Sequence, residues 1–167
     1  MIINMWSGPR NISTAMMRSF ENREDTEVWD EPFYAYYLYE SKKKHPLHKE
    51  IIDNYETDLG KLINKIKNLE SEDGIFYLKH MTHHMLSSIP MEWTLNHKNC
   101  LLIRNPKEVI HSYSLLLIGE SNINYHFLII SQYAFHSPVL SKLTTILSTP
   151  LYAYFKITQN IIYNNQC

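Results

Sequence analysis

Residues 6–14 read WSGPRNIST and directly follow the short apolar stretch that opens the chain. The apolar stretch predicts a buried strand, the Gly-Pro-Arg segment predicts a turn, and the Ser-Thr pair predicts the start of a helix. Backbone N–H groups and the positive end of the dipole make a helix N-terminus attractive to an anion. Arg10 can fork two hydrogen bonds onto a phosphate, and Ser13 and Thr14 add hydroxyls. We therefore expect a phosphate-binding loop; the alternative is a plain turn in which Ser13 caps the helix.

Strand and helix patterns alternate along the first two thirds of the chain. Short apolar strands are predicted at residues 1–6, 26–29, 74–78 and 100–103, and helical spacing at 12–23, 32–39, 48–72 and 106–117. This alternation is typical of an α/β fold in which helices flank a parallel sheet in three layers. Ligands of such sheets bind at the carboxyl ends of the strands, where the motifs of this chain lie.

The composition favours a single intracellular domain that does not bind nucleic acid. The 167 residues carry 16 Lys and Arg against 17 Asp and Glu, a formal net charge of −1, which gives no basis for nonspecific binding to nucleic acid. Two cysteines, Cys100 and Cys167, do not suggest a disulfide framework and favour a reducing compartment. We find no leader and no convincing membrane span in the sequence, so a cytoplasmic location is expected.

A second motif, LLIRNPKEVIHSY, occupies residues 101–113. Arg104 ends a predicted strand, and Ser112 lies about two turns along the helix that follows. An arginine and a serine placed in this way could share a second phosphate, although each by itself would be an ordinary surface residue.

Together the two motifs resemble those of the sulfotransferase family, which has a P-loop NTPase-like fold. In that family the first loop binds the 5′-phosphosulfate of the donor 3′-phosphoadenylyl sulfate (PAPS), and the second motif binds its 3′-phosphate. The second motif fits the form R-[ND]-P-[KR]-[DE]-V-x-x-S-Y. In the first loop, Asn11 and Ile12 replace the Ser-Gly of P-[KR]-S-G-[ST]-T, and SGPRNIST is similar to the loop of a branch of small sulfotransferase-like proteins. The resemblance covers about residues 1–113.

The resemblance implies PAPS as the donor, a hydroxyl or amine as the acceptor, and no metal. Arg10 would stabilise the leaving phosphate, a role that needs neither the lysine nor the Mg²⁺ of a Walker loop. The donor-binding residues implied are Gly8, Pro9, Arg10, Asn11, Ile12, Ser13, Thr14, Arg104 and Ser112.

Two side chains are candidates for the base that takes the proton of the acceptor. Glu31 follows the second strand, and its distance from Thr14 resembles that of the catalytic glutamate in tyrosylprotein-type sulfotransferases; the alternative is that Asp30 or Glu31 caps a helix starting at Pro32. His80 ends the third strand, where cytosolic sulfotransferases have K-x-H, but here His80 directly follows Lys79.

Two histidines and a run of aromatic residues also lie near these candidates in the sequence. His83 and His84 could share a helical face with His80, but no fourth zinc ligand is evident, so we expect ordinary histidines. The aromatic residues Phe33, Tyr34, Tyr36, Tyr37 and Tyr39 are expected to form core, with part of the run lining an acceptor pocket.

The composition changes near Tyr113. The only charged residues from there to the end are Glu120, Lys142 and Lys156. We therefore expect a sulfotransferase-like core at 1–113 and a divergent tail at 114–167, with a fold incomplete at its C-terminus; a truncated or mis-spliced product and a membrane-associating tail are two explanations.

The function expected is sulfuryl transfer from PAPS. The alternatives are an inactive remnant that binds adenosine 3′,5′-bisphosphate and, with less support, a P-loop phosphotransferase or NTP hydrolase. The sequence does not identify the acceptor, which is a small molecule or a peptide, or the oligomeric state.

Overall fold

A parallel sheet of five strands forms the centre of the structure, a computed structural model that describes residues 1–116 and 153–156. The strand order is β2-β3-β1-β4-β5, and every neighbouring pair is parallel. The strands are β1 (Ile2–Ser7), β2 (Thr26–Asp30), β3 (Ile75–Met81), β4 (Lys98–Ile103) and β5 (Ala153–Lys156). The helices are α1 (Ser13–Glu21), α2 (Tyr34–Ser41), α3 (His48–Asn54), α4 (Leu59–Asn68) and α5 (Pro106–Leu116), with short 3-10 turns η1 (Leu69–Ser71), η2 (Thr82–His84) and η3 (Glu92–Thr94). The predicted α/β class is confirmed.

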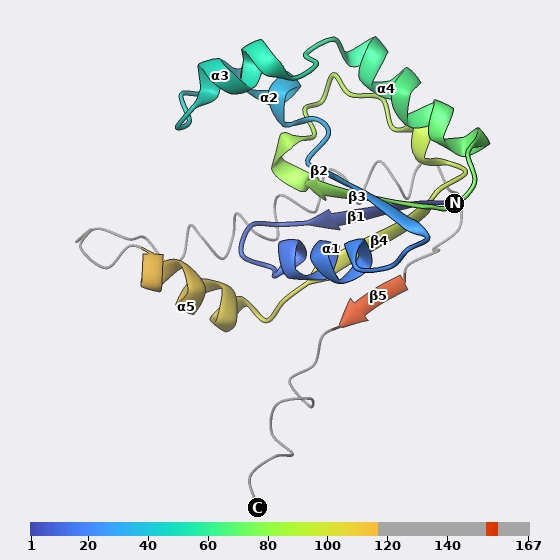
Figure 1. Cartoon of the computed structure of the whole chain (residues 1–167). Helices are drawn as coiled ribbons and strands as arrows, with labels where there is room; N and C mark the ends of the chain where they lie inside the picture. Colours follow the sequence, from blue (N-terminus) through green and yellow to red (C-terminus); the bar gives the residue numbers. More distant parts are fainter. Residues whose placement is uncertain (117–152, 157–167) are drawn as a thin grey trace, which may run out of the picture.

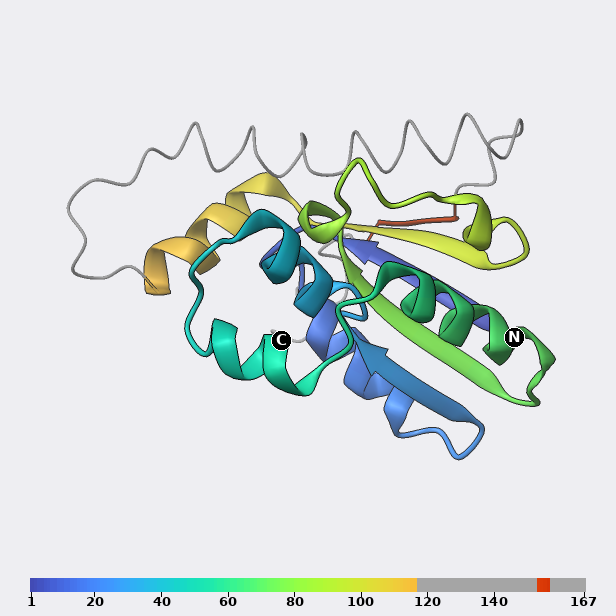
Figure 2. The same cartoon turned by 90° about the horizontal axis from the view of Figure 1, so that it is seen from above.

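Helices cover the sheet on two sides. In Figure 1, α1 lies below the sheet, whereas α2, α3 and α4 lie above it, and Figure 2 shows the second group from above. Successive side chains of a strand point to opposite faces. Trp6 of β1 accordingly belongs to the apolar cluster under α2 and α4, and its neighbour Met5 belongs to the cluster under α1.

The predicted helix at residues 48–72 is wrong in one respect, because the structure divides it. α3 ends at Asn54, Tyr55 is extended, and α4 begins after Asp58, whose carboxylate accepts a hydrogen bond from the Lys61 N–H at 2.9 Å. This N-cap satisfies a free donor of the new helix and stabilises a start there. The apolar spacing continues across residues 55–58, so periodicity alone did not reveal the break.

The end of the chain adds one strand to the sheet. β5 pairs in parallel with β4, and α5 runs past the boundary predicted at residue 113. Residues 117–152 and 157–167 lie outside the described residues, so the proposed tail origin and the division at 113 stay predictions. Over the residues that are described, no helix is both long enough and apolar enough to cross a membrane.

Candidate functional site

The loop between β1 and α1 has an unusual backbone. Arg10 and Ile12 adopt positive φ angles of 61° and 56°, whereas Gly8, the glycine of the loop, is not among the positive-φ residues. A left-handed conformation costs a residue with a Cβ atom roughly 1 kcal/mol. Left-handed residues at alternating positions are the backbone pattern of anion-binding nests. Strain of this kind persists where the surrounding structure enforces it, often at functional sites.

The predicted alternative, in which Ser13 caps the helix, is wrong. The N-cap of α1 is Ile12, which has no side-chain oxygen, and the cap makes no side-chain hydrogen bond. Ser13 is the first residue of the helix and is buried, while Thr14 is exposed. The first turn of α1 therefore keeps backbone donors that its own cap does not satisfy.

Buried contacts hold this loop against the sheet. The Asn11 side chain is buried and donates from Nδ2 to the carbonyl of Leu102 on β4 at 3.0 Å. Thr82, which follows β3, donates from its hydroxyl to the carbonyl of Ser7 at 3.3 Å. The loop is thus tied to both strands that flank β1, which explains how the strained backbone is retained.

The two sequence motifs meet at this loop. Arg10 donates from Nε to the Ser112 hydroxyl at 2.9 Å, and Arg104 donates from Nη1 to the Arg10 carbonyl at 3.0 Å. Arg104 also lies 3.5 Å from the Glu108 carboxylate. No ion pair among the described residues involves Arg10. Two guanidinium groups from distant parts of the chain therefore lie at one edge of the sheet, where they can bind an anion together.

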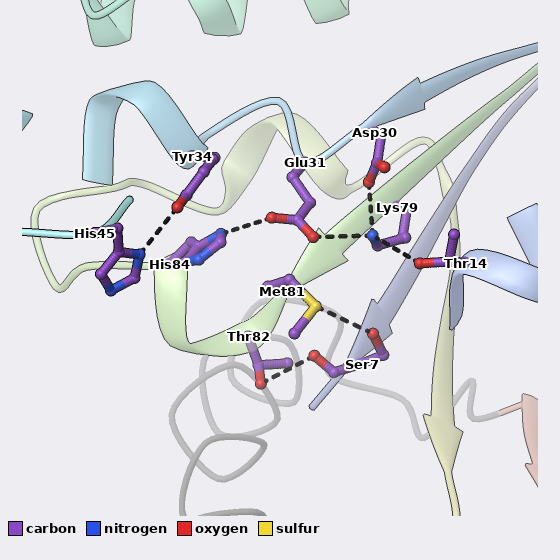
Figure 3. A network of polar contacts seen from close by, with 10 residues as sticks. All are labelled: Ser7, Thr14, Asp30, Glu31, Tyr34, His45, Lys79, Met81, Thr82 and His84. Carbon is purple, nitrogen blue, oxygen red and sulfur yellow. Dashed lines mark hydrogen bonds and ion pairs between the residues drawn. The ribbon is translucent and has the colours of Figure 1, made fainter. Parts of the chain in front are cut away.

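A buried lysine organises the neighbouring part of the edge (Figure 3). The Lys79 ammonium lies 2.6 Å from Asp30 Oδ1, 2.8 Å from Glu31 Oε1 and 3.4 Å from Thr14 Oγ1. Burial lowers the pKa of Lys79, but hydrogen bonds and the charges of the two carboxylates outweigh it, and the net pKa is raised. Lys79 is therefore a cation. It connects the start of α1 with the end of β2.

Glu31 combines a left-handed backbone with a side chain that contacts two neighbours. Its φ is 49°, its N–H donates to the Lys79 carbonyl at 2.9 Å, and its side chain is about a quarter exposed. The N-cap of α2 is Phe33 and makes no side-chain cap hydrogen bond, so the predicted capping alternative for Asp30 or Glu31 is wrong. Glu31 Oε2 lies 3.6 Å from His84 Nδ1 on the side opposite Lys79.

His80, the second candidate base, lies in the core instead. It stacks on Trp6 with ring centroids 4.3 Å apart, and Nε2 donates to Asn4 Oδ1 at 3.2 Å. Burial, with a smaller contribution from His97, lowers the pKa of His80 to about 3. Lys79 and His80 are consecutive residues of β3 and so point to opposite faces, with Lys79 on the side of α1. This position in the core does not favour His80 as the base, and its role stays a prediction.

The other histidines do not form the predicted helical face. His80 belongs to β3, whereas His83 and His84 belong to η2. Burial, followed by His83 and other nearby charges, lowers the pKa of His84 to about 2, so its ring is neutral near pH 7. Tyr34 stacks on His84 at 4.7 Å. Within residues 1–116 and 153–156, no cluster of three or more His, Cys, Asp or Glu side chains is arranged to hold a metal.

The burial of His80 predicts a loss of stability in acid. Its pKa is about 3 in the fold and 6.5 as the ordinary value, so the unfolded chain binds the proton first as the pH falls. The contribution of neutral His80 to the stability of the fold is complete above pH 6.5 and is lost as the pH falls toward 3. We expect the free energy of unfolding to fall by about 2 kcal/mol from this residue alone between about pH 7.5 and 5. Urea unfolding at several pH values measures it; a constant or rising stability would contradict the assignment.

A cavity of about 870 Å³ lies beside Glu31. Of the predicted aromatic run, Tyr34 lines it, whereas Phe33, Tyr36 and Tyr37 are buried and Tyr39 is 54% exposed. Lys79 was not among the site residues predicted from the sequence. The period of two in β3 was the available signal for Lys79, because it separates Lys79 from the apolar face that holds His80.

Comparisons with known proteins matched a family model and curated relatives. A family model described as a sulfotransferase domain matches residues 1–133, which is 20 residues beyond the resemblance found in the sequence. Branched-chain-amino-acid aminotransferase-like proteins 2 and 1 of Arabidopsis thaliana are each 34% identical over 112 residues. The match covers 67% of this chain and 20% of each relative. The chain therefore spans about a fifth of the length of these curated relatives.

Proposed function

Because the chain belongs to the sulfotransferase domain family, we propose that it transfers a sulfuryl group from PAPS to a hydroxyl or amine acceptor. The observation that carries the proposal is the contact between the two motifs. Arg10, Arg104 and Ser112 converge at the carboxyl edge of the sheet although more than 90 residues separate the first from the others. An edge with two guanidinium groups suits a donor that has two separate phosphate positions.

The residues of the edge fit such a donor. The strained loop and the uncapped start of α1 offer backbone N–H groups to the 5′-phosphosulfate. Arg104 and Ser112 are assigned to the 3′-phosphate, and Arg10 is assigned to the phosphate that leaves. Ser112 already accepts a hydrogen bond from Arg10, so one contact network would connect both ends of the donor.

Glu31 is proposed as the base. Bound PAPS supplies an activated sulfuryl group on its 5′-phosphate. Glu31 takes the proton of the acceptor as the acceptor oxygen or nitrogen forms its bond to sulfur. The bond between sulfur and the bridging oxygen breaks, and its electron pair stays with the phosphate, where the charge of Arg10 stabilises it. The products are a sulfate ester or sulfamate and adenosine 3′,5′-bisphosphate. The Lys79 ammonium holds Glu31 in place by pairing with the Glu31 Oε1 atom.

The names of the relatives do not change this proposal. They describe aminotransferase-like proteins, and the shared segment is 20% of their length. We carry no aminotransferase activity over to this chain. A cytoplasmic location, expected from the cysteine content, and the absence of a metal requirement are part of the proposal.

Nucleotide binding tests the proposal directly. We expect adenosine 3′,5′-bisphosphate to bind at least about tenfold more tightly than ATP-Mg, a difference of about 1.4 kcal/mol, because the edge presents two cationic sites to separate phosphates. Isothermal titration calorimetry on the full chain, with and without Mg²⁺, measures both affinities. A preference for ATP-Mg would favour a phosphotransferase, and no binding of either nucleotide would contradict donor binding. Binding of the bisphosphate without turnover of PAPS would favour the inactive remnant.

A further inference from the structure

The cavity beside Glu31 lies where the end of β2 meets helices α2, α3 and α4. It has a volume of about 870 Å³, within the range of roughly 300–1,000 Å³ that is typical of small-molecule sites. The break at residues 55–58 places Tyr55 and Glu56 in the wall rather than inside a continuous helix. Glu31 contacts Lys79 on the side of α1 and also lines this cavity. The proposed base is thus shared between the donor edge and the cavity.

Aromatic and apolar side chains form much of the wall. Trp29 of β2 points to the same face as α4, and Tyr34 and Tyr55 line the cavity from α2 and from the end of α3. Rings of this kind provide flat apolar surfaces on which a ligand ring or hydrocarbon can pack. The wall therefore favours a ligand with an apolar or aromatic body.

Among the described residues of the wall, one cation has no carboxylate partner. Asp30 and Glu31 both pair with Lys79, and Glu56 lies 3.7 Å from Lys61. Lys65, one turn further along α4, has its ammonium 4.5 Å from the centre of the Trp29 ring. No ion pair within the described part of the chain includes Lys65. An anionic group above the Trp29 ring would find a charge partner there.

We propose that this cavity is the acceptor site and that its acceptor is a small aromatic or apolar molecule with an anionic group, such as a hydroxyaryl carboxylate. The reacting hydroxyl lies at Glu31, the body packs against Trp29, and the anionic group pairs with Lys65. The inference rests on the proposed sulfuryl transfer for the identity of the reacting group. The binding preference depends only on the cavity.

A matched pair of probes tests the inference: 4′-hydroxybiphenyl-4-carboxylate and its neutral counterpart 4′-hydroxybiphenyl-4-carboxamide. We expect the carboxylate to bind the full chain about fivefold more tightly, the upper end of what one exposed charge pair contributes. Lys65→Gln should reduce this preference to about twofold or less, because it removes the cation and keeps the first part of the hydrocarbon stem. Lys67→Gln, on the same helix but outside the cavity wall, should leave the preference unchanged. Calorimetry in the absence of nucleotide measures all of these affinities.

The outcomes separate this inference from the proposed function. Equal binding of the two probes, no binding of either, or a preference that survives in Lys65→Gln would overturn the acceptor class. Carboxylate preference that depends on Lys65, in a chain that does not bind adenosine 3′,5′-bisphosphate, would support the cavity as an anion-selective site and defeat sulfuryl transfer. Binding of adenosine 3′,5′-bisphosphate without selectivity between the two probes would support donor binding and overturn the acceptor class.

Discussion

Replacing Glu31 by glutamine is expected to lower the turnover of PAPS by about 10²–10⁴-fold, the usual contribution of a general base. Glutamine keeps the shape of the side chain and can still accept a hydrogen bond from Lys79, but it cannot take the proton of the acceptor. Binding of adenosine 3′,5′-bisphosphate should change by no more than about twofold, because Glu31 makes no contact with Arg10, Arg104 or Ser112. Formation of the bisphosphate from PAPS, with phenol and amine acceptors, measures turnover.

Two controls make the Glu31 experiment specific. Glu27→Gln changes an exposed carboxylate on the same strand and should keep full turnover. Asp30→Asn changes the second carboxylate beside Lys79 and separates the loss of a charge near that lysine from the loss of the base. Full turnover in Glu31→Gln would show that another group takes the proton, and equal losses in Asp30→Asn would assign the effect to Lys79.

Truncation of either arginine at the donor edge should weaken binding of adenosine 3′,5′-bisphosphate by about 10–100-fold, as expected for hydrogen bonds to a charged group. Arg10→Ala removes the guanidinium that contacts Ser112, and Arg104→Ala also removes the hydrogen bond to the Arg10 carbonyl. Arg104→Lys should recover only part of the affinity, because a lysine keeps the charge but not the planar fork. Calorimetry at constant ionic strength gives the three affinities.

The matched control for the arginines is Arg18→Ala. Arg18 lies on α1, its side chain is 60% exposed, and it pairs with Glu21. We expect this variant to bind the bisphosphate like the original chain, which would exclude a general effect of net charge. If Arg18→Ala and Arg104→Ala weaken binding equally, the assignment of the edge to the donor is wrong.

Much of the donor edge could be predicted from the sequence because local rules determine it. A short apolar strand followed by Gly-Pro-Arg and a Ser-Thr pair specifies a strand, a loop and a helix. The family resemblance then assigned Arg10, Arg104 and Ser112 to one donor site. In the structure Arg10 contacts both Arg104 and Ser112. Their roles toward the donor stay predictions.

The arrangement around Lys79 and the cavity could not be predicted in the same way, because it depends on how distant segments of the chain pair and pack. Asp30 lies opposite Lys79 only because of the register of β2 against β3. The break between α3 and α4 depends on the Asp58 cap, which competes with an apolar spacing that favours a continuous helix. His80 was assigned from its place at the end of a strand, and the decisive fact was which face of the strand it occupies.

The left-handed residues of this edge have a consequence for attempts to improve the protein in the laboratory. Arg10, Ile12 and Glu31 each adopt a conformation that glycine would adopt with less strain, by roughly 1 kcal/mol. A selection for thermal stability alone would then tend to accept glycine at these positions and remove the arginine and the glutamate on which the proposed chemistry depends. Directed evolution of this chain therefore needs a binding or turnover screen alongside the stability screen.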